Sequence, residues 1–104
     1  MSRKGVYVLK FTPAVGNERH RARYYVGWTR NLDKRLKQHR GGRGSAISRA
    51  AVKQGCEIEV VLFIPNAGRD MERVIKQSKN VRRWIATYRR AVDQQEDFAD
   101  DRGA

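Results

Sequence analysis

The chain has 104 residues, 39% apolar and 33% charged, which is enough for one small domain with a single modest core. Its longest apolar run, residues 60–65, is far shorter than the roughly 20 residues a membrane span needs, and we see no secretory leader. The lone cysteine, Cys56, excludes an internal disulfide. One cysteine and two histidines are also too few ligands for a structural zinc site. We therefore expect a cytoplasmic protein without a membrane partner.

The net charge of +12 is unevenly distributed along the chain. Residues 1–53 contain 14 Lys and Arg against two acids, whereas residues 54–104 contain nine of each sign. The whole positive excess therefore lies in the first half. Such clustering is typical of a protein that binds a polyanion such as nucleic acid, although a basic surface that serves only solubility is the plain alternative.

Two strands are predicted in the first 29 residues. Residues 5–11 are rich in β-branched and aromatic side chains, and alternation places Tyr7 and every second neighbour on one face. A polar, turn-rich loop is predicted over residues 12–22 and a second strand over residues 23–29. Paired as an antiparallel hairpin with a long tip, the two strands place Tyr7 and Tyr25 on neighbouring strands of one sheet.

A helix is predicted over residues 32–40, with Asn31 as its N-cap. Arg35 and His39 lie one helical turn apart on the flank of its apolar stripe, where we expect them to be neither fully buried nor exposed. The glycine-rich segment 41–44 then ends the helix, and we expect it to be a mobile, basic loop.

The second half of the chain predicts a short helix over residues 46–54, a strand over 56–64 and a long helix over 69–91. Ser45 is the expected cap of the short helix. Strict alternation along the strand places four apolar residues on one face, namely Ile58, Val60, Leu62 and Ile64.

The predicted order of elements is β-β-α-α-β-α. This order indicates an α+β domain with a small three-stranded antiparallel sheet flanked by helices. We assign it to residues 1–92. Residues 93–104 contain five acids and one base, and we expect them to form a flexible acidic tail.

Several side chains have the chemistry that phosphodiester hydrolysis requires. Such a reaction needs an activated water and donors that neutralise the charge on the pentavalent phosphate. Arg35 offers a planar fork of donors, and Tyr7, Tyr25 and His39 offer proton-transfer and positioning groups. Gly27, which has no side chain, would let a backbone or a phosphate approach the sheet.

A divalent ion could assist the reaction, and Glu72 is the one acid placed among basic residues on a helix. Each candidate also has a plain structural interpretation. Tyr7 and Tyr25 could simply pack in the core, and Glu72 could form an ordinary i,i+4 pair with Lys76. Composition and periodicity alone therefore indicate only a small basic α+β domain that binds nucleic acid.

The ordered set of motifs over roughly residues 5–85 resembles the GIY-YIG nuclease family. Gly5-Val6-Tyr7 is similar to the first signature and Tyr25-Val26-Gly27 to the second. Arg35 and His39 then follow the family's order of an arginine and a histidine on the first helix. Glu72 lies in a segment that resembles the one carrying the family's metal-binding glutamate. Where some members carry a lysine, this chain has Trp28, and Arg30 is the candidate replacement.

This resemblance implies a metal-dependent endonuclease that acts on DNA, branched or damaged DNA included, in repair or in a mobile element. Glu72 would anchor Mg²⁺ or Mn²⁺ and Arg35 would stabilise the phosphorane charge. Tyr7 or Tyr25 would activate or orient the attacking water, with His39 assisting, and Gly5 and Gly27 would be structural. With so little surface, we expect low intrinsic sequence specificity. Contacts to the nucleic-acid backbone would come from Arg30, Arg43, Arg49, Lys76 and Lys79.

Two other interpretations stay open at this point. One is a nucleic-acid-binding module that keeps this fold without the chemistry. The other is a partner-binding protein whose basic half meets an acidic protein. The first predicts salt-sensitive nucleic-acid binding that chelation of metal leaves unchanged, and the second predicts no affinity for nucleic acid at low salt.

Overall fold

The computed structural model describes residues 3–16, 19 and 21–88. The predicted acidic tail at 93–104 lies outside this part of the chain. The labelled elements are β1 (Gly5–Gly16), β2 (Arg21–Thr29), α1 (Leu32–Arg40), α2 (Ala46–Lys53), β3 (Glu57–Pro65) and α3 (Arg69–Ser78), and residues 81–88 form a further helix.

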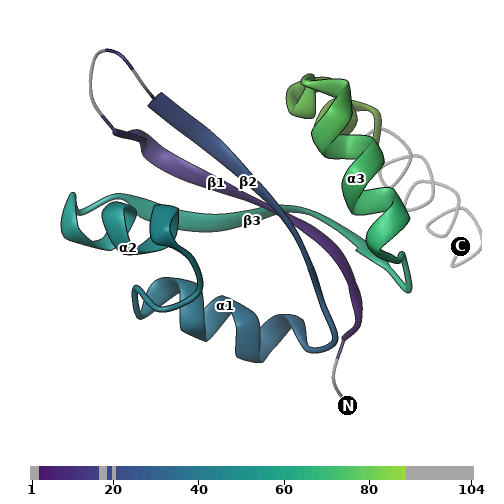
Figure 1. Cartoon of the computed structure of the whole chain (residues 1–104), viewed down its shortest axis with the longest axis horizontal. Helices are drawn as coiled ribbons and strands as arrows, with labels where there is room; N and C mark the ends of the chain where they lie inside the picture. The colour runs from purple at the N-terminus through teal and green to yellow at the C-terminus, as the bar shows by residue number, and fades with distance from the viewer. Residues whose placement is uncertain (1–2, 17–18, 20, 89–104) are drawn as a thin grey trace, which may run out of the picture.

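The three strands form one antiparallel sheet in the order β2-β1-β3, with β1 in the centre. Helices α1 and α2 cover one face of this sheet and α3 covers the other (Figure 1). The predicted α+β class and the three-stranded antiparallel sheet are therefore confirmed.

Alternation along β1 divides the core into two layers, because successive side chains point to opposite faces of the sheet. We call the layer beneath α1 and α2 the α1–α2 core; its buried members are Tyr7, Leu9, Phe11, Val15, Leu32, Ala51 and Ile58. The layer beneath α3 is the α3 core, whose buried members are Val6, Val8, Val26, Leu62, Ile75 and Ile85.

Strand β1 extends to Gly16 and β2 begins at Arg21, so the loop predicted over residues 12–22 is wrong for residues 12–16 and 21–22. Pairing of β1 with β3 ends at Thr12, and its pairing with β2 is interrupted between Lys10 and Val15. Pro13 falls in this gap, where the missing N–H removes no hydrogen bond from either ladder. Pairing with β2 then resumes at Val15 and Gly16, so the two strands pair further along the chain than predicted.

The apolar residues of β3 do not all alternate onto one face as predicted. Val60 packs against the α1–α2 core, whereas Leu62 belongs to the α3 core. The cause is a shift in register, because Val8 pairs with Leu62 while Leu9 pairs with Val60. Val61 is thus the extra residue of a β-bulge, which changes the face of every residue beyond it.

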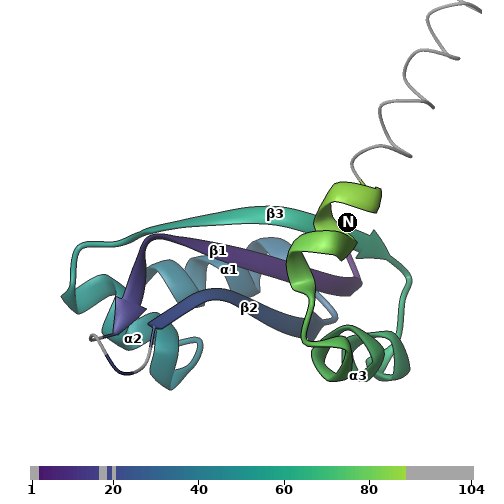
Figure 2. The same ribbon diagram turned by 90° about the horizontal axis from the view of Figure 1, so that it is seen from above.

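The single long helix predicted over residues 69–91 is two helices within the described residues. Helix α3 ends at Ser78, and Lys79 adopts a left-handed conformation with φ 54°. The helix at 81–88 then runs in a different direction (Figure 2). The indole Nε1 of Trp84 donates to Oγ of Ser78 at 3.1 Å, which ties the second helix to the end of the first.

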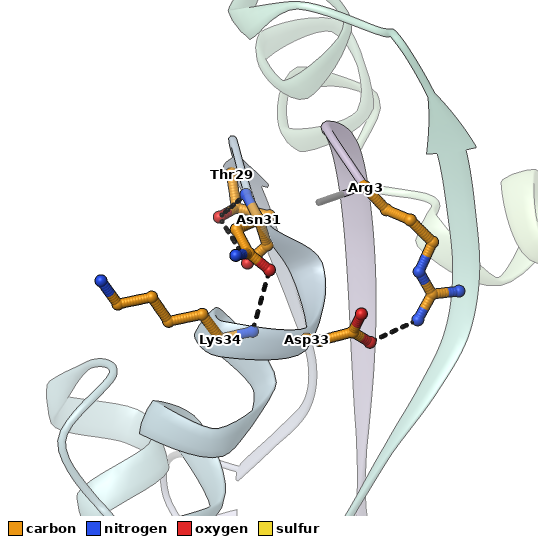
Figure 3. A network of polar contacts seen from close by, with 5 residues as sticks. All are labelled: Arg3, Thr29, Asn31, Asp33 and Lys34. Carbon is orange, nitrogen blue, oxygen red and sulfur yellow. Dashed lines mark hydrogen bonds and ion pairs between the residues drawn. The ribbon is translucent and has the colours of Figure 1, made fainter. Parts of the chain in front are cut away.

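The start of α1 is held to the end of β2 by polar contacts (Figure 3). Oδ1 of Asn31 accepts the Lys34 N–H at 3.1 Å, which confirms the predicted N-cap. The backbone N–H of Asn31 donates to Oγ1 of Thr29, and the guanidinium of Arg3 pairs with Asp33 at 2.6 Å. These contacts fix the start of α1, and they thereby fix the positions of Arg35 and His39 along the helix.

Candidate active site

Tyr7 lies on the central strand and faces α1, and its partner across the ladder on β2 is Gly27. A Cβ at Gly27 would stand 2.5 Å from both Cζ and Oη of Tyr7. The space above Gly27, which we expected a backbone or a phosphate to use, is filled by the Tyr7 ring. Tyr7 is only 1% exposed as a result.

Gly5 has a comparable role at the start of β1. It is buried, and a Cβ there would collide with the backbone carbonyl of Ile64 on β3. Both signature glycines therefore permit close packing between strands. Gly27 lets β2 approach the Tyr7 ring on β1, and Gly5 lets β1 approach the backbone of β3.

Three rings from three elements meet above the sheet. Oη of Tyr7 lies 2.8 Å from Nε2 of His39, within hydrogen-bond distance. The ring of Tyr25 packs edge-on against His39 with centroids 5.0 Å apart, and its centroid lies 6.1 Å from that of Tyr7. The sequence-based prediction that the two tyrosines lie on neighbouring strands of one sheet is confirmed, and the structure places both on the same face.

His39 is fully buried, contrary to the predicted position on the flank between core and solvent. The segment 41–44 folds back over it: the Gly42 N–H donates to the His39 carbonyl at 3.0 Å, and Gly44 packs so tightly on the imidazole that a Cβ would collide with Nδ1. This segment, predicted to be mobile, is held by contacts on both sides. Nδ1 of His39 lies 2.6 Å from Oγ of Ser48 on α2.

Arg35 stands beside the rings and spans α1 and the loop after it. Its Nη1 donates to Oε1 of Gln38 at 3.0 Å, and its Nη2 donates to the Gly44 carbonyl at 2.8 Å. A guanidinium has five N–H donors in a planar fork, so donors remain for an incoming anion. The side chain is only half-buried, which leaves it accessible.

Burial dominates the electrostatics of this group. It raises the pKa of Tyr7 to about 12, an effect that the nearby Arg35 guanidinium partly opposes. Burial, with a smaller contribution from the Arg35 charge, lowers the pKa of His39 to about 4. The Tyr7 hydroxyl in turn raises the pKa of Arg35. At neutral pH the group therefore consists of a protonated Tyr7, a neutral His39 and a cationic Arg35.

Glu72 lies in the first turn of α3, on the opposite face of the sheet from α1 and α2. Its side chain is 19% exposed, and Oε1 of its carboxylate lies 3.8 Å from Nζ of Lys76. Hydrogen bonds and ion pairs among the described residues do not join Glu72 to the tyrosines, Arg35 or His39. The fold thus brings together four of the five predicted catalytic residues and leaves the fifth on another element.

The predicted nucleic-acid-binding cations are all exposed, but they come from both layers of helices. Arg43 and Arg49 lie on the loop after α1 and on α2, whereas Lys76 and Lys79 lie on α3 and at its end. Arg30 follows β2. The indole of Trp28 packs against the α3 core and donates to the Ala67 carbonyl, whereas the cations are exposed to solvent.

The structure adds residues that the sequence did not indicate. Ser48 is fully buried and contacts both His39 and Ser45, and Gly44 closes over the imidazole. Ser45 was identified only as a helix cap, which it is, because its Oγ accepts the Ser48 N–H at 3.1 Å. A Ser at the third position of a capped helix gives no signal for contact with a histidine nine residues earlier.

A model of the GIY-YIG catalytic domain matches residues 3–91. The match covers nearly the whole chain and includes all five predicted catalytic residues. The chain belongs to the GIY-YIG family. Neither the search of curated proteins nor that of solved structures gives a match.

Membership of the GIY-YIG family carries a nuclease function at the family level, with nucleic acid as the substrate. The three-stranded antiparallel sheet and its flanking helices are compatible with the fold of this family. Among the described residues, no helix is long and apolar enough to cross a membrane.

Proposed function

We propose that this GIY-YIG domain is a metal-dependent endonuclease that hydrolyses phosphodiester bonds in DNA with little intrinsic sequence specificity. The observation that carries the proposal is the convergence of Tyr7, Tyr25, Arg35 and His39 from two strands and one helix, anchored by the 2.8 Å contact between Tyr7 and His39. Such convergence of a cation with proton-transfer groups is what attack of water on a phosphodiester requires.

Arg35 is the proposed stabiliser of the phosphorane. Its bonds to Gln38 and to the Gly44 carbonyl hold the guanidinium in place before substrate arrives, and preorganised donors are most effective against charge that develops in the transition state. The fork geometry matches two phosphate oxygens at once.

The two tyrosines are suited to different parts of the reaction. Tyr25 is half-buried, so it can reach the substrate and orient the attacking water, whereas Tyr7 is covered and held by His39. With its pKa raised to about 12, Tyr7 becomes a base only when a neighbouring cation stabilises the phenolate. Arg35 is the proposed cation, because it is the one that already lowers the pKa of Tyr7.

Glu72 is the proposed holder of Mg²⁺ or Mn²⁺. The described residues contain no cluster of three or more His, Cys, Asp and Glu that could hold a metal ion, so Glu72 would act there without two such side chains beside it. A single carboxylate fits Mg²⁺, because this ion keeps several waters and takes one or two carboxylates. The Lys76 contact of 3.8 Å is longer than a charge-assisted hydrogen bond, so the carboxylate oxygens keep free lone pairs. When bound, the ion would supply positive charge against the phosphate and the leaving oxygen.

Little sequence specificity is proposed because the domain is small and its exposed cations are spread over both layers of helices, where they can contact backbone phosphates. Contacts of this type position a protein on nucleic acid without reading its sequence. The substrates to test are therefore plasmid DNA, a branched junction and a duplex that carries a lesion, each in several sequences.

The test is nicking of these substrates in Mg²⁺ by the wild type, Glu72→Gln and Asp70→Asn. Asp70 is a matched control, since it is an exposed acid in the same first turn of α3. We expect the wild type and Asp70→Asn to cut equally and Glu72→Gln to lose roughly 10²-fold or more in rate. A wild type that binds DNA but never cuts it would instead favour the binding module, and equal cutting by Glu72→Gln would refute the metal role of Glu72.

A further inference from the structure

A chain of polar contacts continues beyond the predicted catalytic residues into α2. Oη of Tyr7 contacts Nε2 of His39 at 2.8 Å, Nδ1 of His39 contacts Oγ of Ser48 at 2.6 Å, and Oγ of Ser48 contacts Oγ of Ser45 at 2.6 Å. Tyr7, His39 and Ser48 are at most 1% exposed, whereas Ser45 is half-buried. The chain therefore runs from the covered tyrosine to the edge of the solvent.

The direction of these hydrogen bonds is set by which ring nitrogen of His39 carries its proton. A neutral imidazole donates from one nitrogen and accepts at the other. His39 is neutral at pH 7, because its pKa is lowered to about 4 by burial and by the Arg35 charge. Its partner at Nδ1 thus decides whether Nε2 donates to Tyr7 or accepts from it.

The surroundings of Ser48 favour donation to His39. Its hydroxyl has one proton and three possible acceptors: Nδ1 of His39 at 2.6 Å, Oγ of Ser45 at 2.6 Å, and the Ser45 carbonyl at 3.4 Å. The carbonyl is the most distant. Oγ of Ser45 already accepts the Ser48 N–H as the cap of α2, so its own proton is free to donate to Ser48. The basic nitrogen of the imidazole is then the remaining acceptor for the Ser48 proton.

We propose that Ser48 and Ser45 are positioning residues of this site: they hold His39 with its proton on Nε2, so that the imidazole donates to the Tyr7 oxygen. This deepens the proposed endonuclease function and rests on it. In this arrangement Ser45 donates to Ser48, Ser48 to Nδ1, and Nε2 to Tyr7. His39 is then a donor to the Tyr7 oxygen and not an acceptor of its proton. It favours negative charge on that oxygen once the Tyr7 proton has passed to a water at the site, and it does not become a cation itself.

The assignment gives the two serines a role that packing alone would not. A donor directed at the Tyr7 oxygen favours the phenolate, as the Arg35 guanidinium does. It also leaves the Tyr7 proton pointing away from His39. With the opposite tautomer, Tyr7 would donate to Nε2, and the imidazole would offer no donor to a phenolate.

The position of the ring proton can be measured without any nuclease activity, by ¹⁵N NMR of the His39 side chain at pH 7. We expect a protonated Nε2 and an unprotonated, hydrogen-bonded Nδ1 in the wild type. Ser45→Asp is the informative variant, because Asp caps a helix as well as Ser but its carboxylate only accepts. The Ser48 hydroxyl would then donate to the new carboxylate, and the ring proton should move to Nδ1. Ser45→Thr is the matched control, since it keeps both the cap and the hydroxyl donor.

DNA cleavage supplies the second measurement. We expect Ser45→Asp and Ser48→Ala each to lose on the order of tenfold in cleavage rate. Ser45→Asp should keep the wild-type melting temperature, and Ser45→Thr should keep the wild-type cleavage rate. A wild-type proton on Nδ1 overturns the proposal, as does wild-type cleavage by Ser45→Asp once its ring proton has moved. An inert wild type with its proton on Nε2 would refute the endonuclease function while supporting the assigned hydrogen-bond direction.

Discussion

The Tyr7 hydroxyl rests directly against the backbone of Gly27, with no room for a side chain between the two strands. A Cβ at Gly27 would approach Oη of Tyr7 to 2.5 Å. Gly27→Ala should therefore displace the tyrosine from His39, lower the stability by about 1–3 kcal/mol and abolish most of the cleavage. Urea unfolding and plasmid nicking measure the two effects.

Gly68 provides the control for this substitution. It is exposed, its φ is −100°, and a Cβ there would meet nothing within 4 Å. Gly68 is the N-cap of α3, a position where Gly is preferred to Ala, so Gly68→Ala should cost about 1 kcal/mol through the cap alone and leave cleavage unchanged. If both alanine variants behave alike, then the close approach at Gly27 is not what holds Tyr7 in place.

Burial of a neutral His39 makes the stability depend on pH. Its pKa is about 4 in the folded protein, below the ordinary value of 6.5. Between these values the unfolded chain binds a proton that the folded chain does not, so stability is lost as the pH falls through this window. Between pH 7 and pH 5 we expect a loss of about 2 kcal/mol in the free energy of unfolding.

The measurement is a set of urea titrations at pH 7, 6 and 5 on the wild type and His39→Gln. The variant lacks the titrating ring, so its stability should change little over this range, even if it is lower throughout. Staying above pH 5 keeps most carboxylates ionised. Parallel pH dependences for the two proteins would show that His39 does not titrate as its burial requires.

The sequence predicted which residues meet at the site but not how deeply they are buried. Pairing of the two predicted strands placed Tyr7 and Tyr25 on neighbouring strands of one sheet, and the helical period placed Arg35 beside His39. The burial of His39 depends on Gly44, because only a residue without a side chain allows the loop to close on the imidazole. That contact joins residues five apart across a helix end, where no periodicity applies.

Two errors in the fold have the same origin, a local break in a regular pattern. Every residue around Val61 is apolar, so a bulge there leaves no trace in the hydrophobic alternation. Lys79 ends α3 in a left-handed conformation that Gly or Asn usually adopts, so the sequence carries no stop signal at that point. Both breaks are decided by tertiary packing.

Cleavage should depend on the planar guanidinium of Arg35 and not only on its positive charge. Arg35→Lys retains the positive charge but not the planar donors that reach Gln38 and Gly44. We expect roughly 10²-fold slower cleavage with DNA affinity changed by less than about threefold. Arg40→Lys is the matched control, because Arg40 lies on the same helix and also donates to a backbone carbonyl, that of Ile58. Equal losses for the two would mean that Arg35 acts only by holding its loop.

The exposed cations around α2 should determine the salt dependence of DNA binding. Arg43 and Arg49 are exposed on the same side of the sheet as Arg35, whereas Arg82 and Arg83 lie on the helix at 81–88. If Arg43 and Arg49 each contact a phosphate, Arg43→Gln/Arg49→Gln should reduce the slope of log K against log salt by about 2, equally for unrelated sequences. Arg82→Gln/Arg83→Gln removes the same charge and should reduce the slope much less. Fluorescence anisotropy between low and moderate salt gives both slopes, and identical reductions would show that binding follows net charge and not these two side chains.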